Sequence, residues 1–484
     1  MSRLHKLAAL LLALAAFSAF ANDDDARYEV KYGKNLPFHG GRVTIDHAFG
    51  ELVVRTHNGS DVQVRATIRS SDDEVGKQIR IVTSEAGGVS IKTEYPEVKS
   101  FHGHLSYSVD MTVTVPANAP VTARNRFGST DVRGLQAASV IENKQGSISA
   151  QELRGAQSIS NTFGAIDVRD VRGPLTVANQ NGSITARKVE GTLTATNRFG
   201  AIDVADVRDA ATIVNANGHV EAMDIGGALK VTNAFGNVTA STIGGAADLT
   251  AANGRIEVSN VTGAATLRTT FGSVTATAIR GNLTADGENS KVEASGISGS
   301  ATIDTSFGGV MLKDVTGAAT IKSNNGNIKV SDVGGPLTAE TQFGTVQAER
   351  IRNNATVTNN NGRATLTDIT GNVKVKGSFG PVFISNATGA ISVANSNGAI
   401  SVDGLRAGTC QPLSLSTTFS SIKVALPSNA NYAVNARTSF GRIHTDFPIT
   451  TTTISDQNLL GNIGRGGCKL DIVNSNGSIT IEKE

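Results

Sequence analysis

The stretch that decides the fold is Gly164-Ala-Ile-Asp-Val-Arg-Asp-Val-Arg-Gly-Pro-Leu-Thr-Val-Ala-Asn-Gln-Asn181, and its pattern recurs through most of the chain. Ile166 and Val168, and then Leu175 and Val177, alternate with polar or small residues. An alternation with a period of two predicts two short strands, each with one buried face. Each repeat is therefore expected to form one coil of two strands and two turns.

Glycines mark this repeat with a constant spacing of 18 residues, at positions 128, 146, 164, 182, 200, 218, 236, 254, 272, 308, 326, 344, 362, 380 and 398, with Ser290 in the one missing place. The columns through Ile166 and Val171 keep the same spacing and carry almost only Ile and Val. Such side chains, stacked at the strand spacing of about 4.8 Å, would fill a narrow interior. We predict an all-β fold, a parallel β-solenoid of the β-helix or β-roll type with about sixteen 18-residue coils and β-rich caps at both ends.

The residue before each glycine alternates between Phe and mostly Asn, so the alternation has a period of 36 residues. Coils of 18 residues would align both types along one edge, whereas coils of 36 would put them on opposite corners. We expect 18, because a coil with four walls would enclose more space than these small residues fill. The phenylalanines either fill the corners between coils, the reading we expect, or form a candidate binding edge. These residues are Phe163, Phe199, Phe235, Phe271, Phe307 and Phe343.

The ends of the chain depart from the repeat. Arg3 and Lys6 precede an apolar run, which predicts a secretory signal peptide over residues 1–21. We expect an N-terminal β cap over 22–120, the repeat array over 121–403, and a C-terminal cap with a final coil over 404–484. No later stretch has the roughly 20 apolar residues that a transmembrane helix needs. We therefore expect the protein to be exported and to be located in the periplasm, on the outer cell surface or outside the cell.

Charge and cysteine content limit the partners. Without the leader the chain has equal numbers of basic and acidic residues, so it lacks the excess of Lys and Arg that nucleic acid binding requires.

Cys410 and Cys468 are the two cysteines, and in an oxidising compartment we expect them to pair and staple the C-terminal segment.

Several polar columns could carry structure or chemistry. Two residues before the Phe or Asn stands an asparagine, which predicts an amide ladder along one turn: Asn125, Asn143, Asn161, Asn179, Asn197, Asn215 and Asn233. Asp recurs at 170, 206, 224, 314, 332 and 368, where we expect it to form turns rather than to bind calcium.

Two further groups of polar residues are candidate sites. Outward acids make a loose stripe that we expect to be a solvated face: Asp131, Asp167, Asp203, Glu221, Glu257 and Glu293. Four histidines of the N-terminal cap lack a spacing typical of metal ligands: His47, His57, His102 and His104. We therefore expect no metal, no cofactor and no catalytic residue.

The Gly-x-Ile-x-Val units, the strand Val113-Thr-Val-Pro116 and the C-terminal Asn476-Gly-Ser-Ile-Thr-Ile481 resemble the bacterial putative adhesin family, the Toastrack-like β-solenoid domains of envelope proteins. The resemblance implies a noncatalytic role at the surface or in the periplasm. We expect an adhesin or envelope scaffold that binds glycans or proteins along its length. The alternative is a polysaccharide-cleaving β-helix enzyme, a lyase or a glycoside hydrolase, which needs outward acids and bases beside a groove.

Overall fold

The computed structural model describes residues 26–97 and 105–484, and it is a parallel β-solenoid of about 17 turns with a spacing of about 18 residues. The predicted fold class is thereby confirmed. The chain divides into two compact units, Met1–Gly146 and Ser147–Glu484. The predicted signal peptide, residues 1–21, lies outside the described residues.

The first unit combines coils with antiparallel strands. β2 (Arg42–Asp46) and β3 (Leu52–His57) pair in parallel with β8 (Val121–Phe127) and β9 (Thr130–Arg133), and β8 pairs with β10 (Ser139–Gln145). The strands between them include antiparallel pairs, and one short helix is described: β1 (Tyr28–Pro37), β4 (Asp61–Ser70), α1 (Asp73–Gln78), β5 (Arg80–Ser84), β6 (Gly88–Glu94) and β7 (Tyr107–Pro116). Residues 42–57 thus form a coil that is continued by residues 121–133.

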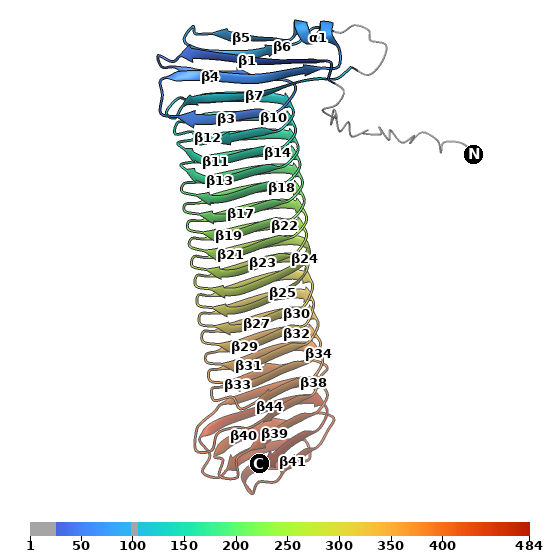
Figure 1. Cartoon of the computed structure of the whole chain (residues 1–484). Coiled ribbons are helices and arrows are strands. Elements are labelled where there is room, and N and C mark those ends of the chain that lie inside the picture. The colour runs from blue at the N-terminus through green and yellow to red at the C-terminus, as the bar shows by residue number, and fades with distance from the viewer. Residues whose placement is uncertain (1–25, 98–104) are drawn as a thin grey trace, which may run out of the picture. The chain divides into compact units, whose positions relative to one another are not determined.

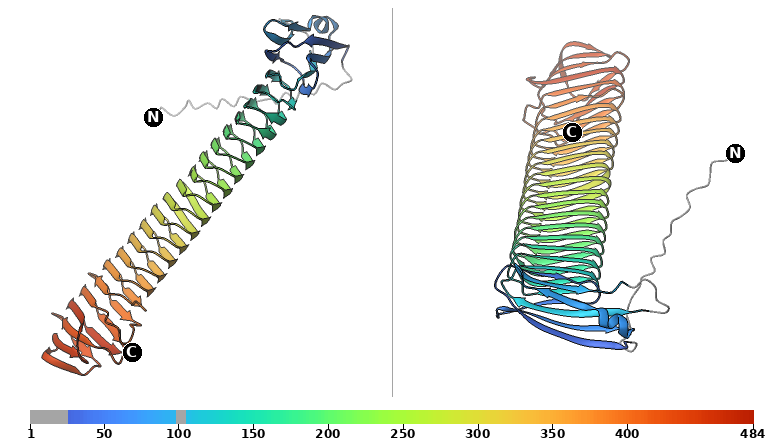
Figure 2. Two further views of the ribbon diagram at one scale, coloured as in Figure 1. Left: turned by 90° about the vertical axis from the view of Figure 1, so that its left-hand side faces the viewer. Right: turned by 90° about the horizontal axis from the view of Figure 1, so that it is seen from above.

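The second unit is a stack of two-stranded coils (Figures 1 and 2). One wall is built from β11 (Ile148–Arg154), β13 (Ile166–Arg172), β15 (Ile184–Val189), β17 (Ile202–Val207), β19 (Val220–Ile225), β21 (Val238–Ile243), β23 (Ile256–Val261), β27 (Val310–Val315), β29 (Ile328–Val333), β31 (Val346–Ile351), β33 (Ala364–Ile369), β35 (Val382–Ser385), β37 (Ile400–Asp403) and β39 (Ile422–Leu426).

The other wall is built from β12 (Gln157–Phe163), β14 (Leu175–Asn181), β16 (Leu193–Phe199), β18 (Ala211–Asn217), β20 (Leu229–Phe235), β22 (Ala247–Asn253), β26 (Ala301–Phe307), β28 (Ala319–Asn325), β30 (Leu337–Phe343), β32 (Ala355–Asn361), β34 (Val373–Phe379), β36 (Ile391–Ala394) and β38 (Leu413–Phe419). β24 (Ala265–Ile279) and β25 (Leu283–Ile297) run through both walls.

The register of the strands settles the length of the coil. Ile166 of β13 lies opposite Ile184 of β15, and Val171 lies opposite Val189. Like side chains therefore meet at intervals of 18 residues, as predicted, and the 36-residue coil is excluded. The core lies between the two walls, where the Ile, Val, Leu and Ala columns are almost completely buried.

The glycine column follows from the closeness of the stacked turns. A Cβ atom at Gly182, which has φ +134°, would lie 2.3 Å from the carbonyl oxygen of Gly164 in the preceding coil. No side chain fits there, so the turn requires glycine. Ser290 is tolerated because β25 passes through this turn as extended strand.

The last coils are stacked out of chain order. β40 (Tyr432–Arg437), β41 (Ile443–Thr445), β42 (Ile449–Ser455) and β43 (Asn458–Ile463) precede β44 (Cys468–Asn476) and β45 (Ile479–Lys483) in the sequence. Yet β44 lies between β38 and β40, and β45 lies between β39 and β41. β42 and β43 continue the β40 side as antiparallel strands.

Candidate functional site

The phenylalanine column of the second unit lies at the turn between the two walls, and its rings are half exposed. Exposure rises from 41 % at Phe163 to 56 % at Phe307 and Phe379. A ring that filled the corner between coils would be buried, so that expected reading is wrong. The candidate binding edge is a row of exposed aromatic rings.

Asparagines separate these rings in register. Phe163 lies opposite Asn181, and Asn181 lies opposite Phe199 in the following coil. The asparagine amide folds back onto the preceding coil, where the Nδ2 of Asn217 donates to the carbonyl oxygen of Arg198 at 3.3 Å. The same bond is made by Asn181, Asn253 and Asn361. These four asparagines therefore lie close to the turn and leave a gap between two projecting rings.

The alternation continues through the coils that are stacked out of chain order. Phe419 lies opposite Asn476, whose Nδ2 donates to the carbonyl oxygen of Thr418. Phe440 begins the coil beyond Asn476, because its backbone N–H donates to the carbonyl oxygen of Ser475 at 2.8 Å. We call the complete series from Phe163 to Phe440 the Phe–Asn row.

The predicted asparagine column is buried and bonds to turn backbone. The Nδ2 of Asn179 donates to the carbonyl oxygen of Gly164 in the preceding coil at 2.9 Å, and its Oδ1 accepts from the N–H of Gln180. Asn143, Asn197, Asn215 and Asn233 reach the equivalent glycine carbonyl, Asn125 reaches that of Gly50, and Asn161 bonds Gly164 in its own turn. Most of these contacts tie a turn to its neighbour, and they engage the Nδ2 of every asparagine in the column, while the buried Oδ1 atoms of Asn215 and Asn233 have no hydrogen-bond partner.

The recurring aspartates occupy a left-handed backbone conformation in the middle of the first wall. Asp170, Asp206 and Asp224 have φ between +54° and +58°. Asp tolerates this conformation better than most residues. The single left-handed residue lets the next side chain, such as Val171, point into the core. This geometry accounts for the column by turn formation.

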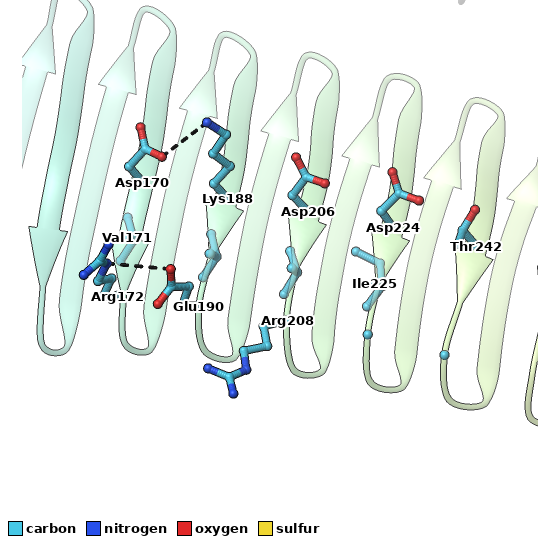
Figure 3. A pocket seen from close by; sticks show the side chains of 14 residues that line it. Asp170, Val171, Arg172, Lys188, Glu190, Asp206, Arg208, Asp224, Ile225 and Thr242 are labelled. Carbon is cyan, nitrogen blue, oxygen red and sulfur yellow. Dashed lines mark ion pairs between the residues drawn. The ribbon is translucent and has the colours of Figure 1, made fainter.

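A groove of about 650 Å³ crosses five coils beside this column (Figure 3). One side carries Asp170, Lys188, Asp206, Asp224 and Thr242, and the other carries Arg172, Glu190, Arg208, Gly226 and Gly244. Ion pairs of 3.6 Å join Asp170 to Lys188 and Arg172 to Glu190 along the two sides. Acids and bases thus face each other across the groove. Sequence reasoning noted the aspartates and missed the charged residues two positions later, Arg172, Glu190 and Arg208, which are the signal that could have found the groove.

The outward acidic stripe is largely ion-paired on a solvated surface. Asp131 pairs with Arg55 at 2.5 Å, Asp167 with Arg169 at 2.8 Å, and Asp203 with Arg187 at 2.5 Å. Glu293 pairs with Lys291, and Glu221 lies 3.9 Å from His219. Glu257 is exposed in the same column. These partners come from the same or adjacent coils, as expected of a solvated face.

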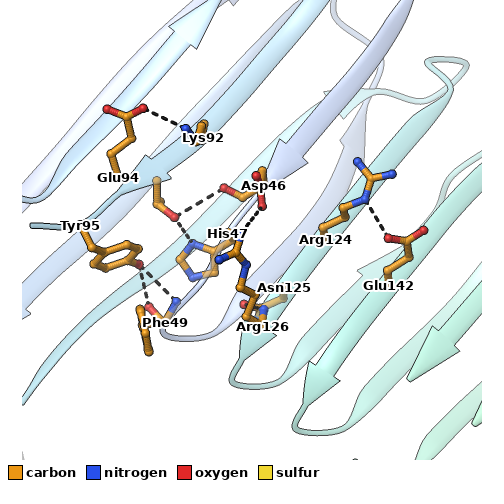
Figure 4. Close-up of polar contacts among 11 residues, drawn as sticks. Asp46, His47, Phe49, Lys92, Glu94, Tyr95, Arg124, Asn125, Arg126 and Glu142 are labelled. Atoms are coloured by element: carbon orange, nitrogen blue, oxygen red, sulfur yellow. Dashed lines mark hydrogen bonds and ion pairs between the residues drawn. The ribbon is translucent and has the colours of Figure 1, made fainter. Parts of the chain in front are cut away.

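The first unit buries one histidine beside an aromatic cluster (Figure 4). His47 is fully buried, its Nδ1 lies 3.3 Å from the Thr93 hydroxyl, and burial lowers the pKa of its ring to about 4. The Tyr95 hydroxyl bonds the backbone of Phe49 at 3.2 Å, and burial raises the pKa of this tyrosine to about 12. His47 is thus a neutral core residue.

The other cap histidines do not join it. The Nε2 of His57 lies 2.7 Å from the carbonyl oxygen of Asp61, and His102 and His104 lie outside the described residues. Within residues 26–97 and 105–484, no group of three or more His, Cys, Asp or Glu side chains is arranged to hold a metal ion. In the same ranges, no helix has the length and hydropathy to cross a membrane.

Cys410 and Cys468 are joined by a disulfide with an Sγ–Sγ distance of 2.07 Å. The bond closes a loop with a sequence separation of 58 residues. Cys468 begins β44, so the disulfide attaches the coil that is stacked out of chain order to the segment before β38.

Comparisons with known proteins extend this description. No curated protein matches the chain. A crystal structure described as a putative cell adhesion protein from Clostridium sporogenes covers 48 % of this chain and 100 % of its own, with 12 % identity and a TM-score of 0.20. At that score the likeness carries no argument about fold or function. Residues 336–482 match the Toastrack DUF4097 family, so the predicted resemblance is confirmed over this part of the chain.

Proposed function

We propose that the protein is an exported, noncatalytic adhesin or envelope scaffold that binds envelope glycans or proteins along its second unit. The observation that carries this proposal is the Phe–Asn row, in which rings more than 40 % exposed recur at every second coil. Extended apolar surface is costly to leave in water and usually marks an interaction site. The parallel strand ladder fixes the spacing of the rings, so a partner would meet a preorganised surface.

Further features support export. The leader-like segment 1–21 is typical of secretion, and the disulfide between Cys410 and Cys468 suits the periplasm, the cell surface or the exterior. The match of residues 336–482 to the Toastrack family agrees with an adhesin-like solenoid.

The test is capture of envelope material by the chain without residues 1–21. Purified wild type and the variant Phe235→Asn/Phe271→Asn/Phe307→Asn are incubated with cell-wall glycan, capsular polysaccharide and solubilised envelope proteins. Asn already occupies the equivalent position in alternate coils, so the variant is expected to fold. We expect loss of capture in the variant only. Equal capture by both proteins, or by neither, contradicts the proposal.

The groove beside Asp170 and Arg172 favours a second candidate function. It places outward acids and bases of adjacent coils around one depression, which is what polysaccharide cleavage on a β-helix requires. Incubation with cell-wall and capsular polysaccharides, followed by measurement of new reducing or unsaturated ends, separates the two functions. Ends that appear with wild type and disappear with Asp206→Asn would establish the enzyme, and their absence leaves the binding role.

A further inference from the structure

From the geometry of the Phe–Asn row we infer that the protein partner of this surface is a second copy of the same chain, paired antiparallel so that the rings of each copy enter the asparagine gaps of the other. This inference rests on the proposed binding role of the row and names its partner.

The first argument is the match of spacing. Rings in alternate coils are separated by two strand spacings, about 10 Å, and each gap between them holds one asparagine, which in five of the gaps is bonded back to the turn. A second copy has the same spacing because it has the same sequence, so the rings of one copy match the gaps of the other over the full length of the row. The coils of the second unit stack directly upon one another along its length (Figure 2).

The second argument comes from the coils stacked out of chain order. Tandem duplication of 36-residue units explains the alternation as far as Asn397, but it does not place Asn476 between Phe419 and Phe440. The alternation of Phe and Asn thus continues through the last coils, although these coils are not stacked in chain order. Its persistence indicates a constraint on the surface itself.

The third argument is the contrast with the first unit. There Phe49 and Phe127 occupy neighbouring coils and stack on each other, with ring centroids 4.9 Å apart and planes 4° apart. In the second unit an asparagine always intervenes, and among the described residues no ring there contacts another ring. These rings are therefore not covered by one another, although the Arg198 guanidinium lies over the Phe199 ring at 5.3 Å from its centroid.

The apolar area of the Phe–Asn row and the charge beside its rings both suit a dimer interface. Eight rings from Phe163 to Phe419 are each about half exposed, so they offer about 100 Å² each and about 800 Å² per copy. Burial on both copies reaches about 1,600 Å², the size of a standard stable interface. Among the residues immediately before these rings only Arg198 is charged, as expected of an interface core.

Symmetry selects the orientation. A two-fold axis parallel to the solenoid would bring rings to the same level, where they collide. A perpendicular axis reverses one copy and lets rings alternate. The register that uses the row from Phe163 to Asn476 places Phe307 of one copy opposite Asn289 of the other, and Phe163 opposite Asn476, and it leaves Phe440 outside the pairing.

Sedimentation equilibrium of the chain without residues 1–21 tests the inference. We expect a dimer in the micromolar range for wild type and a monomer for Phe235→Asn/Phe271→Asn/Phe307→Asn/Phe343→Asn. The matched variant Asn289→Phe/Asn325→Phe adds apolar surface but fills two gaps. Interdigitation predicts a weaker dimer for it, whereas a stronger dimer would indicate unspecific hydrophobic association and overturn the inference.

Cross-linking tests the register, since both native cysteines are already paired. Phe307→Cys and Asn289→Cys chains are expected to form a disulfide-linked dimer when mixed and oxidised, and much less when each is oxidised alone. Equal cross-linking in all three samples contradicts the antiparallel pairing. A chain that stays monomeric yet captures envelope material through the row overturns the self-pairing and leaves the proposed function standing. A dimer that captures no envelope material overturns the proposed function and leaves the self-pairing standing.

Discussion

Thr242 adopts a left-handed backbone conformation, φ +57°, in the column where Asp, Asn and Gly predominate. A β-branched residue is strained there, at a cost of order 1–3 kcal/mol. We predict that Thr242→Asn raises the free energy of unfolding by about 1 kcal/mol, measured by urea denaturation. The reciprocal change Asn260→Thr, one coil later, is the control and should lower it. A loss of stability in Thr242→Asn would show that this column is not limited by backbone strain.

His47 links the stability of the first unit to pH. Its pKa is about 4 in the folded chain against an ordinary value of 6.5, because burial disfavours the charged ring. The unfolded chain therefore binds the proton more readily, and the contribution, about 3 kcal/mol, is complete above pH 6.5 and lost as the pH falls towards 4.

NMR of the histidine ring should show His47 titrating near pH 4. The variant His47→Gln should lose less stability than wild type between pH 7 and 4, as followed by tyrosine fluorescence, since four of the five tyrosines belong to the first unit. A midpoint above pH 6 would mean that the ring is accessible to water.

Single residues were the hardest feature to predict from the sequence. The glycine and asparagine columns were visible because their spacing is constant. The exposure of the phenylalanines was not, because a ring beside a turn glycine can point into a corner or away from it, and only the shape of the turn decides. The groove is lined by two columns that each mix acidic and basic residues, and the aspartates alone do not reveal it.

The turn that carries Asn179 is stabilised by a hydrogen bond between neighbouring coils. Replacing Asn179 by Ala removes the bond that ties its turn to the Gly164 carbonyl of the preceding coil, which keeps only the donor from Asn161, at a cost of about 1 kcal/mol. Asn179→Thr should cost less, because Thr269 makes the equivalent bond to Gly254 at 3.2 Å. Ala251 occupies the same column, so Ala251→Asn should stabilise. Urea denaturation of the three variants measures these effects, and equal costs for Ala and Thr would contradict the role of the bond.

The C-terminal disulfide stabilises the coils that it joins. In the loop-entropy model, a loop with a separation of 58 residues gives a stabilisation of about 4 kcal/mol. We predict that Cys410→Ser/Cys468→Ser increases hydrogen exchange in residues 404–484 and leaves residues 148–380 unchanged, because coils interact only with their neighbours. Unchanged exchange in the C-terminal coils would show that packing alone holds them.

Strand type and register were predictable because buried columns at a spacing of 18 residues leave one way to stack. The order of the last coils was not. The sequence predicts a final coil at residues 474–481, yet β44 and β45 lie inside the stack, because a local pattern does not determine which neighbour a strand meets.

For the whole molecule, the position of β44 and β45 predicts how truncation acts. Without residues 468–484, β40 and β41 lose their parallel partners, and β38 and β39 become an exposed edge. We expect hydrogen exchange to rise over residues 413–463 and the truncated chain to aggregate through its open edge. Residues 148–380 should keep their protection and serve as the internal control. Protection of β40 in the truncated chain would mean that it can stack on β38 directly.

The same arrangement bears on how the polypeptide reaches its native state. During synthesis, residues 432–445 emerge before residues 468–483, although the later segment belongs between them and β38–β39. Coils up to β39 can be added one upon another as they are made, each using the previous one as a template. The last step differs, because β40 and β41 cannot take their final positions until β44 and β45 have inserted between them and β38–β39. Until then β40 is paired only with the hairpin of β42 and β43. Completion of this stack is therefore a single concerted event, and a ribosome pause between residues 445 and 468 is the moment at which the chain is most open to mispairing.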